Sequence, residues 1–237
     1  MAGVTPDQLD AYRRDGAVVL PGLFSSDELG AALVALDGGD VPGLTGALTD
    51  RAGNPSQLAI WFDHPSHALA DLGLDARVVA IARTVLGGDI YHWHSKLIFK
   101  EAGSTGGFDW HQDYGYWYDD GCPFPRMMSV MIALDAATRA NGCLEVLLGS
   151  QRLGRINHGY VGEDVAADRT RVALLIDRFE QRAVELAPGD ALVFDCLTLH
   201  ASAPNPSPHP RRALIVSFNA MDNVPVGGGG HGQPVAL

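Results

Sequence analysis

Two histidines and one aspartate offer a ligand set for a metal ion. His111 and Asp113 lie in "WHQDYGYW", and His200 ends the apolar run "ALVFDCLTLH" 87 residues after Asp113. Two neutral imidazoles and one carboxylate can bind one face of an iron(II) ion and leave positions for a co-substrate and dioxygen. A His-x-Asp pair alone is a weak signal, because such pairs also occur by chance. The distal histidine and its context therefore have to support the assignment.

An arginine downstream of this set can bind an anionic co-substrate. Arg211 lies 11 residues after His200, on the next predicted strand. There its guanidinium can make paired hydrogen bonds to a carboxylate. His158 and Arg169 have the same spacing, so spacing alone leaves both pairs open. Context favours His200 and Arg211, which flank a loop between two apolar strands, whereas His158 lies in the polar segment "GRINHGY".

Strand patterns dominate the second part of the chain. Residues 90–100 alternate as a strand does, which predicts one face with the following side chains: His92, His94, Lys96, Ile98 and Lys100. Further strands are predicted at residues 127–135, 142–149, 183–187, 191–200 and 211–220. Many short strands separated by turns indicate a sandwich, jelly roll or barrel, with His111 and Asp113 at a strand end.

The first part of the chain is predicted to be largely helical. Thr5 before Pro6 marks one helix start, and Ser25 with Glu28 forms a capping box for a second helix. Further patterns predict a strand at residues 16–20 and helices at 75–86 and within 168–181. We therefore expect one domain over 1–226, with a helical layer over 5–88 packed outside a barrel over 89–220. The glycine-rich end, 227–237, is predicted to be a flexible tail.

Composition narrows the functional class. The chain has 17 basic and 28 acidic residues and a net charge of −11, without a basic stripe, which argues against a nucleic-acid partner. Mean hydropathy is +0.04 and no run of about 18 apolar residues occurs, which argues against disorder and a membrane span. Three widely separated cysteines and an N-terminus without an apolar signal segment favour reduced thiols in the cytoplasm. The oligomeric state is left open.

Residues 5–220 resemble the phytanoyl-CoA dioxygenase superfamily of iron(II)/2-oxoglutarate enzymes, which includes ectoine hydroxylase. The resemblance is carried by "WHQDYGYW", "NGCLEVLLGSQRLG" and "PGDALVFDCLTLHASAPNPSPHPRR". It implies a mainly β fold, the double-stranded β-helix, in which His111, Asp113 and His200 bind Fe(II). The resemblance also implies that the co-substrate 2-oxoglutarate is held by three further residues: Arg211, Ser202 and Lys100. It implies an oxygenase reaction with dioxygen.

The substrate is expected to be a small polar molecule, a free amino acid or an amino-acid-derived natural-product precursor. An acidic chain, with Asp119 and Asp120 close to the predicted site, disfavours the polyanionic coenzyme A. Trp117 matches a pocket tryptophan of ectoine hydroxylase, whereas His94 and Lys96 differ from that enzyme, so ectoine itself is not the expected substrate. The candidate substrate contacts are residues on the predicted strand face and around the His-x-Asp motif: His94, Lys96, Tyr114, Trp117 and Arg126.

Other outcomes remain open at this stage. The same cofactors serve acyl-CoA hydroxylation, desaturation and epimerisation, and these depend on substrate placement. Halogenases of this kind usually lack the carboxylate ligand, so Asp113 argues against halogenation. A non-catalytic barrel that binds a small ligand is an alternative of another class, but it has no need for both the ligand set and Arg211.

Overall fold

Two antiparallel sheets and a separate hairpin form the framework. The computed structural model describes residues 3–39, 46–50, 52–161, 164–227 and 236–237. The larger sheet has seven strands, in the spatial order β1 (Ala17–Leu20), β11 (Ala191–Asp195), β6 (Met127–Ala133), β13 (Arg211–Ala220), β4 (Ile90–Lys100), β3 (Pro55–Trp61) and β2 (Gly46–Thr49). The smaller sheet has the order β10 (Glu180–Val184), β7 (Leu144–Leu148), β12 (His200–Ser202) and β5 (Phe108–His111). The hairpin consists of β8 (His158–Val161) and β9 (Asp164–Ala167).

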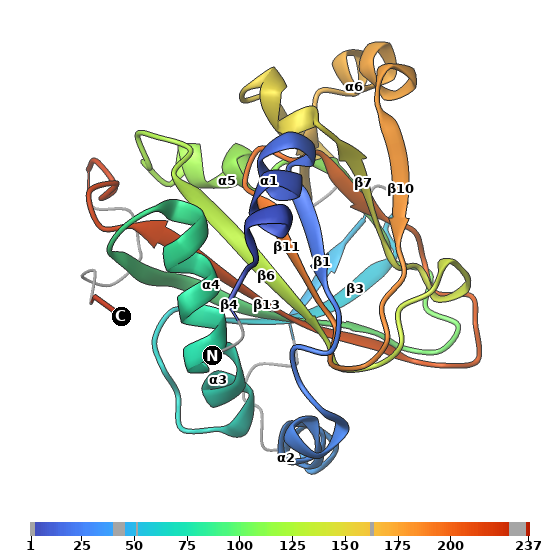
Figure 1. Cartoon of the computed structure of the whole chain (residues 1–237). Coiled ribbons are helices and arrows are strands. Elements are labelled where there is room, and N and C mark those ends of the chain that lie inside the picture. The colour runs from blue at the N-terminus through green and yellow to red at the C-terminus, as the bar shows by residue number, and fades with distance from the viewer. Residues whose placement is uncertain (1–2, 40–45, 51, 162–163, 228–235) are drawn as a thin grey trace.

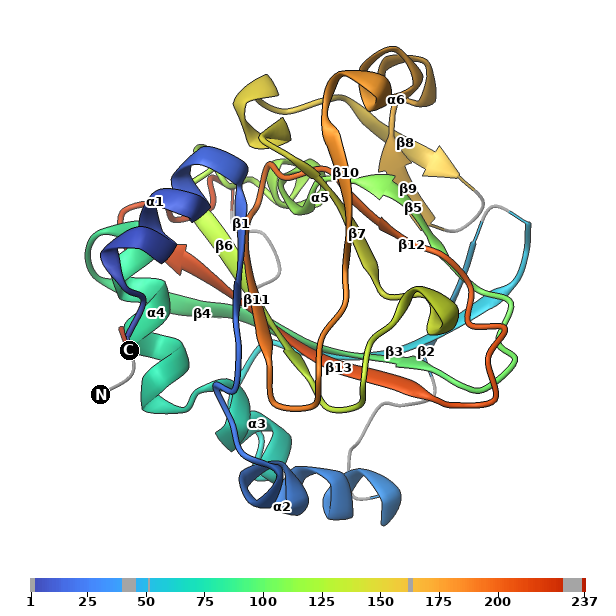
Figure 2. The same cartoon turned by 45° about the vertical axis from the view of Figure 1, so that its right-hand side comes forward.

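The two sheets face each other and pack through their inner side chains (Figure 2). Met131 and Phe194 of the larger sheet belong to one buried cluster with Leu144 and Val146 of the smaller sheet. Inner and outer side chains alternate along each strand, so one face of each sheet can be committed to this interior. The predicted double-stranded β-helix is confirmed.

Helices cover the outer face of the larger sheet, as Figure 1 shows for α3 and α4. The N-terminal helices are α1 (Pro6–Asp15), α2 (Ser26–Asp37), α3 (Ala68–Gly73) and α4 (Ala76–Leu86). Ser25 makes the predicted capping box with Glu28, and Thr5, predicted only as a helix start, makes a second one with Gln8. Leu69 and Ile81 from the helices join Val216 of β13 in a buried cluster. Two strands, β2 and β3, were not predicted in this helical layer; β3 pairs with β4.

Strand β4 has the predicted bounds, but a bulge changes which side chains share a face. Its register with β13 shifts by one residue between His92 and His94, so Trp93 is the extra residue. His92 Nε2 lies 2.8 Å from Oγ of Ser95, whose side chain faces α3 outside the barrel. Trp93 instead packs against Trp117, as His94 does. The prediction that His92 lies on the face of His94 is therefore wrong.

Two other predicted elements end earlier than expected. The strand predicted over 191–200 ends at Asp195, where the carboxylate accepts a hydrogen bond from Leu197 N at 2.8 Å in a turn. His200 then begins β12, which lies in the other sheet. The helix predicted within 168–181 stops as α6 (Arg169–Leu175) and the 3-10 helix η3 (Ile176–Arg178). Strand β10 then begins before its predicted start at residue 183.

Several short elements were not predicted: α3, α5 (Asp113–Asp119), the β8–β9 hairpin, and the 3-10 helices η1 (Arg139–Asn141) and η2 (Ser150–Leu153). Of the predicted tail, residues 228–235 lie outside the described part of the chain, while Ala236 forms a β-bridge with Tyr91 at the start of β4. Among the described residues, no helix has the length and apolar composition needed to cross a membrane.

Candidate metal and co-substrate site

The structure brings the three predicted metal ligands together. His111 ends β5, Asp113 begins α5, and His200 begins β12, directly opposite His111 in the antiparallel register. The two imidazole centroids are 4.1 Å apart, and one ligand atom from each of the three residues lies within 4.8 Å of the others. All three side chains are buried. The three side chains therefore form a compact site at the edge of the smaller sheet.

Hydrogen bonds orient both imidazoles for metal binding. His111 Nδ1 lies 2.7 Å from the carbonyl oxygen of Asp109, and His200 Nδ1 lies 2.9 Å from that of Thr198. A carbonyl only accepts, so each Nδ1 carries the proton and each Nε2 offers its lone pair. Burial lowers the pKa of His200, although the charge of Asp113 opposes this effect. A neutral imidazole is the form that binds a metal ion.

The carboxylate of Asp113 is ionised, and one of its oxygens accepts a hydrogen bond. Burial alone would raise its pKa, but the nearby positive charge of Lys96 opposes burial and contributes most to holding the pKa well below its usual range. Ser129 Oγ donates to Asp113 Oδ2 at 3.0 Å, and Oδ1 faces His200 Nε2 at 3.9 Å. One carboxylate and two neutral imidazoles with oriented nitrogens fit a divalent ion such as Fe(II).

Ser129→Ala is expected to weaken metal binding by about 10- to 100-fold, because Asp113 loses the hydrogen bond that orients it. An equilibrium titration with Co(II) measures this affinity. Ser95→Ala is the matched control, since Ser95 is also buried but lies on the opposite face of the larger sheet. Equal affinities in the Ser129 variant and the unaltered protein would show that this bond does not support the ligand.

Two buried cations lie at the other end of the site. Arg211 of β13 and Lys100 of β4 are register partners, and each is 2% exposed. Burial, followed by the charge of Arg211, lowers the pKa of Lys100 to about 7, and burial lowers that of Arg211 to about 10. Within the described residues neither cation forms an ion pair, and Arg211 Nε has no hydrogen-bond partner. Such an arrangement suits an anionic ligand.

Lys100 is hydrogen-bonded to Ser202. Its ammonium donates to Ser202 Oγ at 2.7 Å and to the backbone oxygens of Ser202 and Ala203. Ser202 and Arg211 both line the cavity that contains the three metal ligands. The predicted co-substrate residues thus lie together, with Arg211 and Ser202 facing the cavity and Lys100 fixing the serine.

The cavity has a volume of about 330 Å³ and mostly apolar walls. Its apolar lining comes from both sheets, from α5 and from the residue after β3: Leu58, Ile60, Phe62, Ile98, Phe108, Tyr116, Trp117, Met131, Leu144, Phe194 and Ile215. Ile60 and Phe62 are 44% and 46% exposed, so they mark the open end, whereas Arg211 marks the closed end. The three predicted metal ligands therefore share one cavity with the buried Arg211 side chain and an apolar entrance.

Comparison with known proteins identifies the family. The family model of phytanoyl-CoA dioxygenase (PhyH) matches residues 12–213. The chain belongs to the phytanoyl-CoA dioxygenase family. It is 33% identical over 234 residues to an ectoine dioxygenase of Halomonas elongata, covering 91% of this chain and 70% of that protein. An ectoine dioxygenase of Sphingopyxis alaskensis is 30% identical over 240 residues, with coverages of 94% and 78%.

Solved structures agree with this family assignment. EctD from S. alaskensis with 2-oxoglutarate and 5-hydroxyectoine superposes with a TM-score of 0.80 at 29% identity, covering 99% of this chain and 86% of that chain. The epimerase SnoN from nogalamycin biosynthesis has a TM-score of 0.74 at 18% identity, with coverages of 91% and 82%. The second likeness concerns the fold alone.

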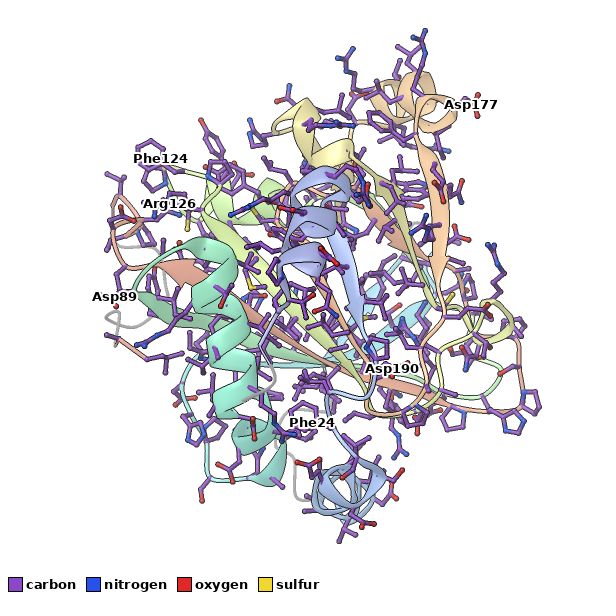
Figure 3. All side chains as sticks on the ribbon, viewed as in Figure 1. Phe24, Asp89, Phe124, Arg126, Asp177 and Asp190 are labelled. Atoms are coloured by element: carbon purple, nitrogen blue, oxygen red, sulfur yellow. The ribbon has the colours of Figure 1, made fainter. Side chains whose placement is uncertain are left out.

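The predicted substrate contacts of this dioxygenase family member separate into two groups. His94, Lys96 and Trp117 line the cavity. Tyr114 packs in a neighbouring buried cluster and donates its hydroxyl to the Cys122 carbonyl at 2.9 Å. Arg126 lies at the periphery beside Phe124 (Figure 3), pairs with Asp222, and has a side chain that is 45% exposed. The structure does not bring Tyr114 and Arg126 to the cavity.

Some residues at the site were missed by sequence reasoning. Ser129 supports Asp113, and the signal was a single hydroxyl inside the otherwise apolar "MMSVMIA" of β6. Phe62 lines the cavity mouth, with its ring centroid 6.0 Å from that of His94, and it directly follows β3, a strand that was not predicted. His158, the rival ligand by spacing, is not in the metal-ligand cluster found among the described residues. Its Nε2 accepts from the backbone N–H of Gln112 at 2.9 Å.

Proposed function

We propose that this protein is an Fe(II)- and 2-oxoglutarate-dependent dioxygenase that hydroxylates a small polar metabolite, a free amino acid or an amino-acid-derived precursor. The observation that carries the proposal is the shared cavity, in which the two-histidine, one-carboxylate set lies with the buried Arg211 and Ser202. Relatives over most of the chain are ectoine dioxygenases, and ectoine is a small amino-acid derivative.

Each group of cavity residues has a role that follows from its chemistry. His111, Asp113 and His200 would hold Fe(II), while Arg211 and Ser202 would hold the distal carboxylate of 2-oxoglutarate. Together, bound Fe(II) and 2-oxoglutarate supply the activation of dioxygen, with 2-oxoglutarate oxidised to succinate and carbon dioxide. The apolar walls exclude water from the reacting groups and place the substrate C–H bond beside the ligand set.

The size and charge of the cavity support a small substrate. The cavity, with a volume of about 330 Å³, has to contain the co-substrate as well as the reacting part of the substrate. Asp120 lines the same cavity, and the chain carries a net charge of −11, which disfavours the phosphates of an acyl-CoA. These features support hydroxylation of a small metabolite over that of a coenzyme A thioester.

The position of Lys96 indicates that the substrate carries a carboxylate. Its ammonium lies 3.6 Å from Asp113 Oδ1, and its side chain is 20% exposed on the cavity wall. When Asp113 binds a metal ion, the negative charge that Lys96 faces is shared with a cation. A substrate carboxylate at this position would restore the charge balance.

Lys96→Met is expected to raise the KM for a carboxylate substrate by about 10- to 100-fold, because an ammonium–carboxylate hydrogen bond contributes about 1.5–3 kcal/mol. Steady-state kinetics with varied substrate measure the change. Lys96→Arg retains the charge and should recover part of the affinity. Arg126→Ala is the control, since Arg126 lies outside the cavity. An unchanged KM in Lys96→Met would mean that the substrate carboxylate, if present, binds elsewhere.

A substrate panel tests the function. Protein loaded anaerobically with Fe(II) and 2-oxoglutarate is exposed to dioxygen with amino acids, ectoine-type solutes or acyl-CoA esters, and both succinate and product mass are measured. The proposal predicts coupled addition of one oxygen atom to a small polar compound. Coupled oxidation of an acyl-CoA alone would overturn the substrate class, and loss of two hydrogens or an unchanged mass would indicate desaturation or epimerisation. Failure to form succinate under any condition would favour a non-catalytic barrel.

We also propose that the chain forms a single dioxygenase domain and that it functions in the cytoplasm. Cys122, Cys143 and Cys196 are buried as free thiols, which suits a reducing compartment that also keeps iron ferrous. The acidic net charge supports a small-molecule partner and disfavours nucleic acid.

A further inference from the structure

The residue between two metal ligands, Gln112, is fully buried and links several segments. Its side-chain Nε2 donates to the carbonyls of Gly154 and Leu197 at 2.9 and 2.7 Å, and its Oε1 accepts from Ile156 N at 2.7 Å. Leu197 lies in the turn that leads to His200. The side chain of Gln112 therefore ties the segment that carries His111 and Asp113 to the segment that carries the third ligand.

The backbone of Gln112 is held by His158, the first residue of β8. Because the Gln112 N–H can only donate, His158 Nε2 must accept this bond, which is 2.9 Å long. The proton is then on Nδ1, which lies 2.8 Å from the Ile156 carbonyl. One imidazole thus connects the ligand motif to the Ile156 segment in a single tautomer.

The close approach of His158 depends on a glycine in α5. A Cβ atom at Gly115 would lie 2.3 Å from ring atoms of His158, which is far inside van der Waals contact. The first turn of α5, which begins with Asp113, therefore leaves space for this imidazole. The ring packs against that turn and also bonds to the residue before it.

We propose that His158 is a positioning residue of the metal site, which fixes the backbone between His111 and Asp113 through its hydrogen bond to the backbone N–H of Gln112. The inference rests on the metal site of the proposed function. In β5 the sheet pairing ends at His111, and Gln112 has no side-chain cap bond at the start of α5. The hydrogen bond from Gln112 N to His158 Nε2 therefore sets the direction in which the chain leaves β5. That direction fixes the distance between the His111 and Asp113 side chains.

A purely structural role for His158 makes a different prediction from a positioning role. The first lowers stability alone, whereas the second also lowers metal affinity and changes the ligand field. His92 offers a matched control. It is half-buried like His158, burial lowers the pKa of both side chains to about 4, and its Nε2 also has a hydrogen-bond partner, Ser95. His92 lies on the outer side of the larger sheet, away from the metal ligands.

The test compares Co(II) binding and the Co(II) absorption spectrum in His158→Leu, His158→Gln and His92→Leu, with thermal unfolding of each variant. His158→Leu should bind Co(II) at least about 10-fold more weakly, with an altered spectrum. His158→Gln, whose side-chain oxygen can accept from Gln112 N, should recover most of the affinity. His92→Leu should lose stability to a similar degree but retain the affinity and spectrum. If His158→Leu does not fold, His158→Asn, which is too short to reach Gln112 N, replaces it.

The outcomes are distinguishable. Unaltered protein that binds no Co(II) would overturn the metal site itself and this inference with it. Normal binding by the unaltered protein and by His158→Leu, or its folding substitute, would overturn the positioning role alone. Equal weakening in His158→Gln and His158→Leu, or in His92→Leu, would also contradict it, since the effect would then not come from the bond to Gln112.

Discussion

Replacement of His200 by alanine is expected to abolish turnover and to remove specific metal binding. His200 is the one predicted ligand that comes from a different segment of the chain, and its Nε2 faces Asp113 Oδ1 at 3.9 Å. Without it, two ligands remain on one short segment, too few to hold the ion on one face of its coordination sphere. Equilibrium dialysis with Fe(II) under anaerobic conditions measures the binding, and succinate release measures turnover.

Two controls make this experiment specific. His209→Ala removes an exposed histidine on the loop after β12 and should leave both measurements unchanged. His158→Ala tests the rival histidine and should weaken binding without abolishing it, because His158 contacts Gln112 and not the ligand cluster. Full activity in His200→Ala, with complete loss in His158→Ala, would transfer the third ligand to His158 and contradict the assignment.

Arg211→Ala is expected to raise the concentration of 2-oxoglutarate needed for half-maximal rate by about 30-fold or more. Removing one partner of a buried, hydrogen-bonded charge pair costs about 2 to 5 kcal/mol, and each 1.4 kcal/mol is about tenfold in affinity. The buried Arg211 Nε, without a partner among the described residues, supplies a donor for the incoming carboxylate. Kinetics with varied 2-oxoglutarate, at saturating Fe(II), measure this change.

The neighbouring arginine is a matched control. Arg212 points to the other side of β13, where it pairs with Asp135 and Asp37. Arg212→Ala should lower stability while the requirement for 2-oxoglutarate stays the same. Arg211→Lys should be intermediate, because a lysine keeps the charge but not the planar pair of donors. If Arg211→Ala has normal 2-oxoglutarate affinity, the co-substrate is bound elsewhere in the protein or is a different molecule.

Much of the fold could be predicted from local patterns and from the family resemblance. Strands β4 and β13 have the predicted bounds, since the alternating pattern of β4 and the apolar run of β13 are each bounded by loop residues. The resemblance added the double-stranded β-helix and the enzyme family, and both predictions are confirmed by the structure and by the related proteins. It also placed the ligand set and Arg211, whose roles stay predictions until they are measured.

Other features depend on packing that the local sequence does not carry. Helix α5 forms from "DYGYWYD", whose glycine and aromatic residues have weak helix propensity, because Tyr114 and Trp117 are buried against β4. The bulge at Trp93 reverses the alternation within a strand that reads as regular. Arg126 immediately precedes β6, but only the fold shows that it pairs with Asp222 at the periphery, outside the cavity.

One cavity is expected to hold both Fe(II) and 2-oxoglutarate for a reaction that consumes dioxygen. The most direct measurement is succinate formation by metal-free protein reconstituted anaerobically with Fe(II) and 2-oxoglutarate and then exposed to dioxygen, with omission of each component in turn. Succinate is expected only when Fe(II), 2-oxoglutarate and dioxygen are all present, and none is expected from His200→Ala. Succinate formed without Fe(II), or at an equal rate by His200→Ala, or absent from the fully reconstituted protein with every substrate tested, would contradict this expectation.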